Sequence, residues 1–384
     1  MHTPSLSWKR WLTRCLAFVL TLFACDLWVQ VRWAALLQTD IGAQYRLPAD
    51  QEVPVLNATL DQIARLPDFS TRLSTGPKVM FLGSSPTYGV SITDPAATYP
   101  AVVRQHWLNA QPPKPLAVYN LAAKGFLMAD NYYLLQRSLP LGELFVIQLN
   151  YHTFSPRLLE STPIRHPELP ETLGVSISHS EARLLGLRPS PLVNLNAPLR
   201  HWLRQHWFFY REKERLAALW LGASPENWLY RQFFAQASDE EAPDSQPFYT
   251  LPNARQVYMV KRYAENVDFE ITSHNPELQF LERMLRLLQA SGKPAVFFLA
   301  PINADALNYY EVMDWQRYAS HSQLLRQKIE GAGFRFLDPN LASNGQEPLT
   351  EEHFADISHT LNSGAKLFGA RLAQFLKPEL ERLP

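Results

Sequence analysis

The chain has 384 residues, of which 46% are hydrophobic and 19% are charged. This is enough for one large domain, or for one domain with an insertion. Because 36 basic side chains balance 36 acidic ones, no net field attracts a polyanion, and nucleic-acid binding is excluded as a main function. Both cysteines, Cys15 and Cys25, lie near the N-terminus, so the rest of the chain depends on its hydrophobic core without disulfides.

The first 40 residues have the pattern of a membrane anchor. An apolar run over 15–25 follows three basic residues, Lys9, Arg10 and Arg14. Basic residues before an apolar stretch favour an amino end in the cytoplasm and a following domain outside it. The run is shorter than the ~20 residues of a clean spanning helix. A cleaved signal peptide and a lipoprotein signal ending at Cys25 therefore stay open beside the anchor, which would place Asp26 near the outer interface.

The anchor interpretation predicts a single-pass protein of the cytoplasmic (inner) membrane. Its main domain would face the periplasm or another extracytoplasmic space, because the basic residues precede the apolar run. A linker region over 41–77 would join the anchor to that domain.

Beyond the linker, five short apolar runs alternate with helical patterns. The runs cover 78–82, 116–119, 144–149, 294–300 and 334–337. Each is short enough to be a buried strand of a parallel sheet. The clearest helical pattern, over 275–288, has Pro276 near its start and Gly292 beyond its end. The alternation predicts an α/β fold with a doubly wound, mainly parallel five-stranded sheet and a site at the carboxyl ends of its strands.

The alternation breaks over 155–274, which is too long for a crossover connection. We interpret this stretch as a largely helical insertion between two parts of one domain, 78–154 and 275–384. It contains an aromatic and basic helix candidate over 199–221 and an acidic loop over 238–244. The helix candidate either forms a lid over the open face of the sheet or lies at the membrane, where it would grip lipid headgroups or transmembrane helices of a partner.

Four short blocks follow or flank the predicted strands. They are Gly-Ser-Ser at 83–85, Asn-Leu-Ala-Ala-Lys-Gly at 120–125, Gln-Leu-Asn-Tyr at 148–151 and Asp-Ile-Ser-His at 356–359. A strand ending at Gly83 and a helix starting at Pro86 would hold Ser85 at the helix N-cap, beside free backbone N–H groups. A serine there suits acyl transfer if a base takes its proton. The last block offers that base in His359, with Asp356 three residues earlier to fix the imidazole tautomer.

In their order, the four blocks resemble those of the SGNH (GDSL-type) hydrolase superfamily. The resemblance covers 78–151 and 294–376 and leaves the insertion unexplained. It implies a catalytic triad of Ser85, Asp356 and His359. It also implies that the N–H groups of Ser85 and Gly125, with the side-chain amide of Asn150, form an oxyanion hole.

Two blocks depart from the usual pattern of the superfamily. Ser84 stands where aspartate is usual, and Gln148 and Tyr151 stand where glycine and aspartate are common. The Gly-Ser-Ser form is similar to a divergent, membrane-anchored branch that includes the D-alanyl-transfer protein DltD and SGNH-like proteins of surface-polysaccharide O-acylation. This likeness implies a membrane-bound O-acyltransferase (MBOAT) as partner, an acetyl or D-alanyl group, and a surface glycan or related polymer as acceptor.

Ordinary structural roles exist for each block. Gly-Ser-Ser can be a plain helix cap, Asp356 can cap the last helix with His359 in its first turn, and Asn150 can be a turn residue. Two other functions also stay open: an independent envelope esterase or lipase with water as acceptor, and a non-catalytic scaffold. No HExxH or CxxC spacing occurs, so neither a metal nor another cofactor is expected. Lys124 and His152 are further candidates for substrate contact.

Overall fold

The computed structural model describes residues 5–45, 76–109, 116–159, 163–166, 169–186, 203, 206–210, 216, 246–342 and 347–383. Most of the predicted linker, most of the helix candidate over 199–221 and the acidic loop over 238–244 lie outside these residues. The chain divides into two compact units. The larger comprises residues 44–188 and 241–384, and the smaller comprises residues 1–43 and 189–240.

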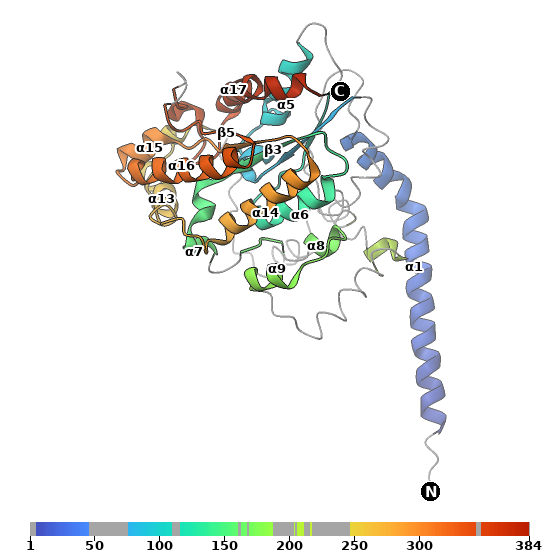
Figure 1. The fold of residues 1–384 in the computed structure, drawn as a ribbon. Helices are drawn as coiled ribbons and strands as arrows, with labels where there is room; N and C mark the ends of the chain where they lie inside the picture. The colour runs from blue at the N-terminus through green and yellow to red at the C-terminus, as the bar shows by residue number, and fades with distance from the viewer. Residues whose placement is uncertain are drawn as a thin grey trace. The chain divides into compact units, whose positions relative to one another are not determined.

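The larger unit is built on a five-stranded parallel sheet, with helices around it (Figure 1). The strands are β1 (Lys78–Leu82), β2 (Ala117–Asn120), β3 (Leu144–Leu149), β4 (Ala295–Leu299) and β5 (Arg335–Leu337). Their order is β2-β1-β3-β4-β5, the flavodoxin-like arrangement of doubly wound sheets. The predicted α/β fold class is confirmed, and each predicted run matches a strand to within one residue at each end.

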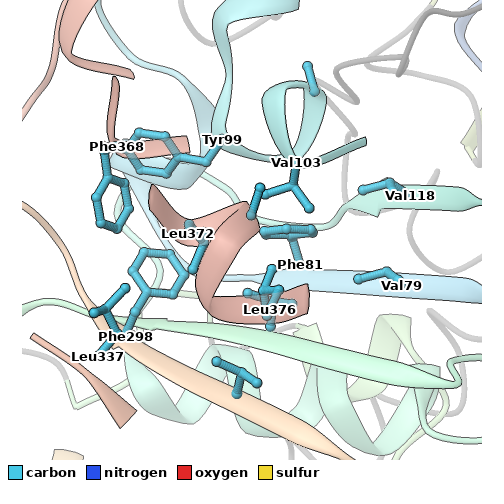
Figure 2. Close-up of a cluster of buried hydrophobic side chains, with 14 of the residues drawn as sticks. Val79, Phe81, Tyr99, Val103, Val118, Phe298, Leu337, Phe368, Leu372 and Leu376 are labelled. Carbon is cyan, nitrogen blue, oxygen red and sulfur yellow. The ribbon is translucent and has the colours of Figure 1, made fainter. Parts of the chain in front are cut away.

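One face of the sheet is covered by α5 (Tyr99–Leu108) and α17 (Asn362–Glu381), which pack against each other. Alternate strand residues such as Val79 and Phe81 point into this layer, as Figure 2 shows. The Tyr99 ring of α5 lies 4.9 Å from that of Phe368 on α17, edge to face. Each large side chain fully buried here stabilises the fold by about 1.5–3 kcal/mol. This layer holds the start of α17, and the loop before it, against the sheet.

The opposite face is covered by α6 (Met128–Ser138) and α14 (Pro276–Ser291). Their shared core includes the rings of Tyr132 and Phe280, whose centroids lie 5.5 Å apart. Asn275 begins α14 by accepting the Leu278 N–H through its side chain, and Gly292 ends it in the left-handed region with a φ of 65°. The helix predicted over 275–288 is therefore confirmed, with its end three residues later.

Further helices and turns complete the larger unit. Within its described residues, the further helices are α4 (Ser85–Tyr88), α7 (Pro156–Leu159), α8 (Leu169–Thr172), α9 (His179–Leu184), α13 (Asn253–Ala264), α15 (Ala304–Tyr309) and α16 (Trp315–Gly331). Four 3₁₀ turns accompany them: η1 (Pro95–Ala97), η2 (Tyr151–Phe154), η3 (Phe248–Thr250) and η4 (Glu351–His353). Of all these elements, α4 and η2 matter most for the site, because they follow directly on the carboxyl ends of β1 and β3.

The first segment of the smaller unit forms a long helix, α1 (Ser5–Tyr45). Its segment Thr13–Arg32 is long and apolar enough to cross a membrane by length and composition, and large apolar side chains such as Phe18 and Phe23 are exposed along it. Cys15 and Cys25 both lie in this helix as free thiols.

A buried carboxylate joins α1 to the aromatic segment of the same unit. Asp26 is 6% exposed and accepts hydrogen bonds from the backbone N–H groups of Phe208 at 3.1 Å and Phe209 at 2.5 Å. Val29, Phe208 and Leu216 form a small apolar cluster beside it. Part of the helix candidate over 199–221 is therefore fastened to the apolar helix.

Candidate active site

Ser85 follows the carboxyl end of β1 and is the first residue of α4. The N-cap is Ser84, which has extended backbone angles and accepts the Tyr88 N–H at 2.9 Å through its carbonyl. The predicted N-cap position of Ser85 is therefore wrong by one residue. The cause is Pro86, which fits the second position of a helix as well as the first because both N–H groups lack an intrahelical partner. Ser85 is partly exposed, and as a first-turn residue its own N–H also lacks an intrahelical acceptor.

The structure brings Ser85, His359 and Asp356 into one hydrogen-bonded chain. His359 Nε2 lies 2.8 Å from Ser85 Oγ, and His359 Nδ1 lies 2.6 Å from Asp356 Oδ2. Since an ionised carboxylate only accepts, Nδ1 carries the proton that it shares with Asp356. The Nε2 lone pair then faces the Ser85 hydroxyl, which is the arrangement that a general base requires.

A tight loop before α17 fixes the acid and the base. Phe354 and Thr360 form an antiparallel bridge, and the Ala355 N–H donates to the His359 carbonyl at 2.8 Å. Asp356 Oδ1 accepts the N–H groups of Ser358 and His359, each at 2.7 Å. Because α17 begins only at Asn362, the alternative in which Asp356 caps that helix is wrong. The carboxylate organises its own loop instead.

The electrostatics of the pair favour an imidazolium stabilised by Asp356. Burial lowers the pKa of His359, but the charge and the hydrogen bond of Asp356 raise it by more, so the pKa of His359 lies above its ordinary value. Burial raises the pKa of Asp356. The positive charge of His359 and three hydrogen bonds lower it by more, so the pKa of Asp356 lies below its ordinary value. Asp356 therefore stays ionised at neutral pH and can stabilise the positive charge of His359.

Asn150 lies beside Ser84 at the end of β3. Its side-chain Nδ2 donates to Ser84 Oγ at 2.5 Å, and its Oδ1 accepts from Gln148 Nε2 at 2.6 Å. Gln148 Oε1 in turn accepts the backbone N–H of Thr87 at 3.1 Å. One of the two amide hydrogens of Asn150 is therefore engaged with Ser84.

Gly83 allows this network to form next to β1. A Cβ atom at this position would lie 2.8 Å from both Cβ and Oε1 of Gln148 and 3.2 Å from Thr87 Oγ1. Those separations are below van der Waals contact, so any side chain here would displace Gln148. The glycine of the first block thus has a packing role.

Gly125 lies in the turn after β2, at the same edge of the sheet, with a φ of +79°. A left-handed conformation of this kind favours glycine by itself. A Cβ atom here would meet the Arg165 side chain, with Nε at 3.5 Å. The turn is tied to α4 through Asn120, whose Nδ2 donates to the Thr87 carbonyl at 2.9 Å and whose Oδ1 accepts the Ala122 N–H at 3.2 Å.

His152 and Lys124, both candidates from the sequence, stand near the acid and the base. Burial lowers the pKa of His152 to about 4, helped by the positive His359, so this imidazole is neutral at pH 7. Its ring lies 5.5 Å from that of Tyr263. The positive charge of Lys124 lowers the pKa of His359, which places the ammonium group within electrostatic reach of the base.

Sequence reasoning missed the role of Gln148, which it counted only as a departure from a pattern. A signal was present, because Gln148 is the one polar residue of the fully buried strand β3. A buried amide needs partners, so a network around it was to be expected. Within the described ranges, no three His, Cys, Asp or Glu side chains gather closely enough to hold a metal ion.

Comparisons with known proteins find likeness at the level of structure. No protein-family model matches the chain, and no curated protein sequence matches it. Among solved structures, a lipase/acylhydrolase from Enterococcus faecalis aligns with 80% of this chain and 97% of its own, with a TM-score of 0.38 and 12% identity. An acetyl xylan esterase, AlAXEase, aligns with 78% of this chain and 99% of its own, with a TM-score of 0.32 and 8% identity.

Proposed function

We propose that this protein transfers acyl groups through an ester formed on Ser85. The observation that carries the proposal is the hydrogen-bonded chain from Ser85 Oγ through His359 to Asp356, with separations of 2.8 and 2.6 Å. His359 Nε2 takes the hydroxyl proton while Oγ attacks the carbonyl carbon of an acyl donor. Asp356 stabilises the imidazolium, which then gives its proton to the leaving group, and the acyl group stays on Ser85.

The second half of the reaction repeats these steps with an acceptor. His359 takes a proton from an acceptor hydroxyl, or from water, and the resulting oxygen nucleophile attacks the acyl carbon. The bond between that carbon and Ser85 Oγ breaks, and Oγ recovers its proton from His359. The products are the acylated acceptor and the free enzyme.

Three donors are proposed to stabilise the negative oxygen of each tetrahedral intermediate. They are the N–H of Ser85 in the first turn of α4, the N–H of Gly125 and the second amide hydrogen of Asn150. The Asn150 amide is fixed before the reaction, because its contacts with Ser84 and Gln148 hold it. Losing one such donor typically costs about 3 kcal/mol in the transition state.

We propose further that the enzyme is tethered to the cytoplasmic membrane with the larger unit on the extracytoplasmic side. The apolar segment Thr13–Arg32 and the basic residues before it support this setting. A membrane-bound O-acyltransferase would deliver an acetyl or D-alanyl group, and a surface glycan or polymer would accept it. This part rests on the similarity to the membrane-anchored SGNH branch.

The chemistry is tested with the full-length protein in detergent and 4-nitrophenyl acetate as donor. We expect a rapid first release of nitrophenol and a peptide acetylated at Ser85 by mass spectrometry. Ser85→Ala should abolish both signals. Ser358→Ala is the matched control, because it removes a hydroxyl from the loop between Asp356 and His359 without touching the proton path.

The proposed role in acylation of a surface polymer is tested in cells that lack the wild-type gene. Wild type should restore the acyl content of the surface polymer, and Ser85→Ala at equal protein level should not. Full restoration of polymer acylation by Ser85→Ala would show that the protein acts as a non-catalytic scaffold. Rapid ester hydrolysis by the isolated protein, with unchanged polymer acylation in the deletion strain, would identify an independent envelope esterase.

A further inference from the structure

Two cationic side chains flank the Gly125 turn. Lys124 precedes Gly125 in the chain, and the Arg165 side chain packs against the glycine, with Nε 3.5 Å from the position that a Cβ would take. Both cations are exposed. Among the residues that the structure describes, no carboxylate lies within ion-pair distance of either one. The edge of the site beside the proposed oxyanion hole therefore carries two uncompensated positive charges.

The position of Arg165 is fixed by a buried carboxylate. Asp130, near the start of α6, is fully buried, and its oxygens accept the backbone N–H groups of Arg165 at 3.0 Å and His166 at 2.9 Å. It also accepts the Leu127 N–H at 2.9 Å. The His166 ring packs edge to face on Phe126 at 5.3 Å. Two contacts therefore clamp residues 163–166 beside the Gly125 turn.

Holding a surface residue in this way costs free energy. Burying a carboxylate costs free energy that hydrogen bonds only offset, and a solvent-exposed arginine with no ligand needs no such support. The Asp130 oxygens accept three backbone N–H groups and make no printed contact with the guanidinium, which leaves the exposed side chain of Arg165 beside the Gly125 turn. The arrangement holds a cation in place while leaving its donors free.

Lys124 connects the cationic pair to the chemistry. Its charge acts on His359, the base that must deprotonate the acceptor hydroxyl. That hydroxyl has to lie within hydrogen-bond distance of His359 Nε2 during the second half of the reaction. An acceptor placed there lies within electrostatic reach of Lys124.

We propose that Lys124 and Arg165 bind an anionic group, a phosphate or a carboxylate, on the alcohol that takes the acyl group from Ser85. This inference rests on the proposed function. A guanidinium presents paired N–H donors that match phosphate and carboxylate oxygens, and an ammonium adds a point charge. In the step itself, the acceptor O–H loses its proton to His359, a bond forms between that oxygen and the acyl carbon, and the bond from that carbon to Ser85 Oγ breaks. Ser85 Oγ receives the proton.

The experiment compares three alcohols that share one carbon skeleton. Full-length protein in detergent is given 4-nitrophenyl acetate as donor with equal concentrations of glycerol, glycerol 3-phosphate and glycerate. Mass spectrometry quantifies the three acetylated products. We expect both anionic acceptors to be acetylated in preference to glycerol, and the preference to fall as ionic strength rises. The two anionic arms separate a phosphate-bearing acceptor from a carboxylate-bearing one.

Variants assign this preference to the two cations. Arg165→Gln and Lys124→Gln should each lower the ratio of anionic to neutral product about fivefold, and Arg165→Lys should keep most of it. Lys293→Gln is the matched control, because Lys293 precedes β4 at the amino edge of the same sheet. It should leave the ratio unchanged.

Two results would overturn the inference. One is that glycerol is acetylated as fast as the anionic alcohols, or that none of the three alcohols is acetylated. The other is a product ratio in Arg165→Gln and Lys124→Gln equal to that of Lys293→Gln. Failure of the proposed function looks different, because acetyl-Ser85 would then not form at all, whichever alcohol is present.

Discussion

His359 Nε2 lies 2.8 Å from Ser85 Oγ, although 274 positions separate the two residues in the chain. Their meeting depends on α17 and α5 packing on one face of the sheet, which holds the loop over 354–360 next to the end of β1. The hydrogen bond is thus a product of the whole fold. It also makes the two side chains one functional unit with Asp356.

Because the three side chains act as one unit, single and double substitutions should lower kcat by nearly the same factor. Ser85→Ala and His359→Ala should each lower kcat with 4-nitrophenyl acetate by at least about a thousandfold, and the double variant should be little worse than either. Urea unfolding should show a loss of only about 1 kcal/mol for Ser85→Ala, since the side chain of Ser85 does not cap α4. A double variant whose loss equals the product of the two single losses would contradict a shared step.

The pH dependence of the reaction should follow His359. Its pKa lies above the ordinary 6.5, because Asp356 outweighs the effect of burial, and only the neutral imidazole can take a proton. Activity should therefore rise with pH through that raised pKa. Lys124 lowers this pKa, so Lys124→Gln should move the acid limb of kcat/KM to higher pH, and Lys124→Arg should leave it in place. An acid limb that does not move in Lys124→Gln would remove Lys124 from the surroundings of the base.

A methyl group at position 83 should disturb the site through Gln148. In Gly83→Ala the new Cβ would lie 2.8 Å from Gln148, which must shift and release its contacts with Asn150 and Thr87. We expect a loss of about 1–3 kcal/mol in the free energy of unfolding and a lower kcat. Gly331→Ala is the control, because a Cβ there meets nothing within 4 Å at the end of α16, and it should be neutral or slightly stabilising. Equal stability of the two variants would show that position 83 tolerates a side chain.

The buried Glu277 should make stability decline toward alkaline pH. Burial raises its pKa to about 8 from 4.5, although the Met128 N–H and the Thr153 side chain donate to it. The folded protein therefore holds a proton that the unfolded chain releases above its own pKa of 4.5. The stabilising contribution of this group is complete below 4.5, shrinks as pH rises, and is lost above about 8.

Glu277→Gln keeps the shape and an acceptor for Met128 but cannot ionise. Its free energy of unfolding should fall less between neutral and alkaline pH than that of the wild type, as measured by urea unfolding at several pH values. Parallel pH curves for the two proteins would show that Glu277 ionises as readily in the folded state as in the unfolded chain.

Much of the fold could be predicted from the sequence because its strands are short apolar runs buried on both faces. The run over 144–149 is such a case, and its bounds match β3. The order of the blocks likewise predicts Ser85 and His359 at one edge of the sheet, where the structure has them in contact. The exact residue at which α4 begins could not be predicted, since Pro86 is compatible with either of the first two positions.

The supporting contacts of the site were harder to predict, because they join residues far apart in the chain. Ser84 and Asn150 meet only through the pairing of β1 with β3, and local composition does not reveal that the amide donates to a hydroxyl. The hold of Asp130 on Arg165 depends on residues 163–166 folding back on α6, a path that no periodicity in the sequence describes. Such contacts follow from tertiary structure alone.

The carboxylate of Asp26 has a consequence for the order of biosynthesis. It lies in the apolar helix α1, and its hydrogen-bond donors, the N–H groups of Phe208 and Phe209, follow 182 and 183 residues later in the chain. An acidic side chain is costly in lipid until it is paired. In a membrane-seated α1, Asp26 therefore waits unpaired while that whole stretch is synthesised and exported. A nascent chain stopped before Phe208 would therefore lack the two N–H donors that this carboxylate accepts in the folded protein.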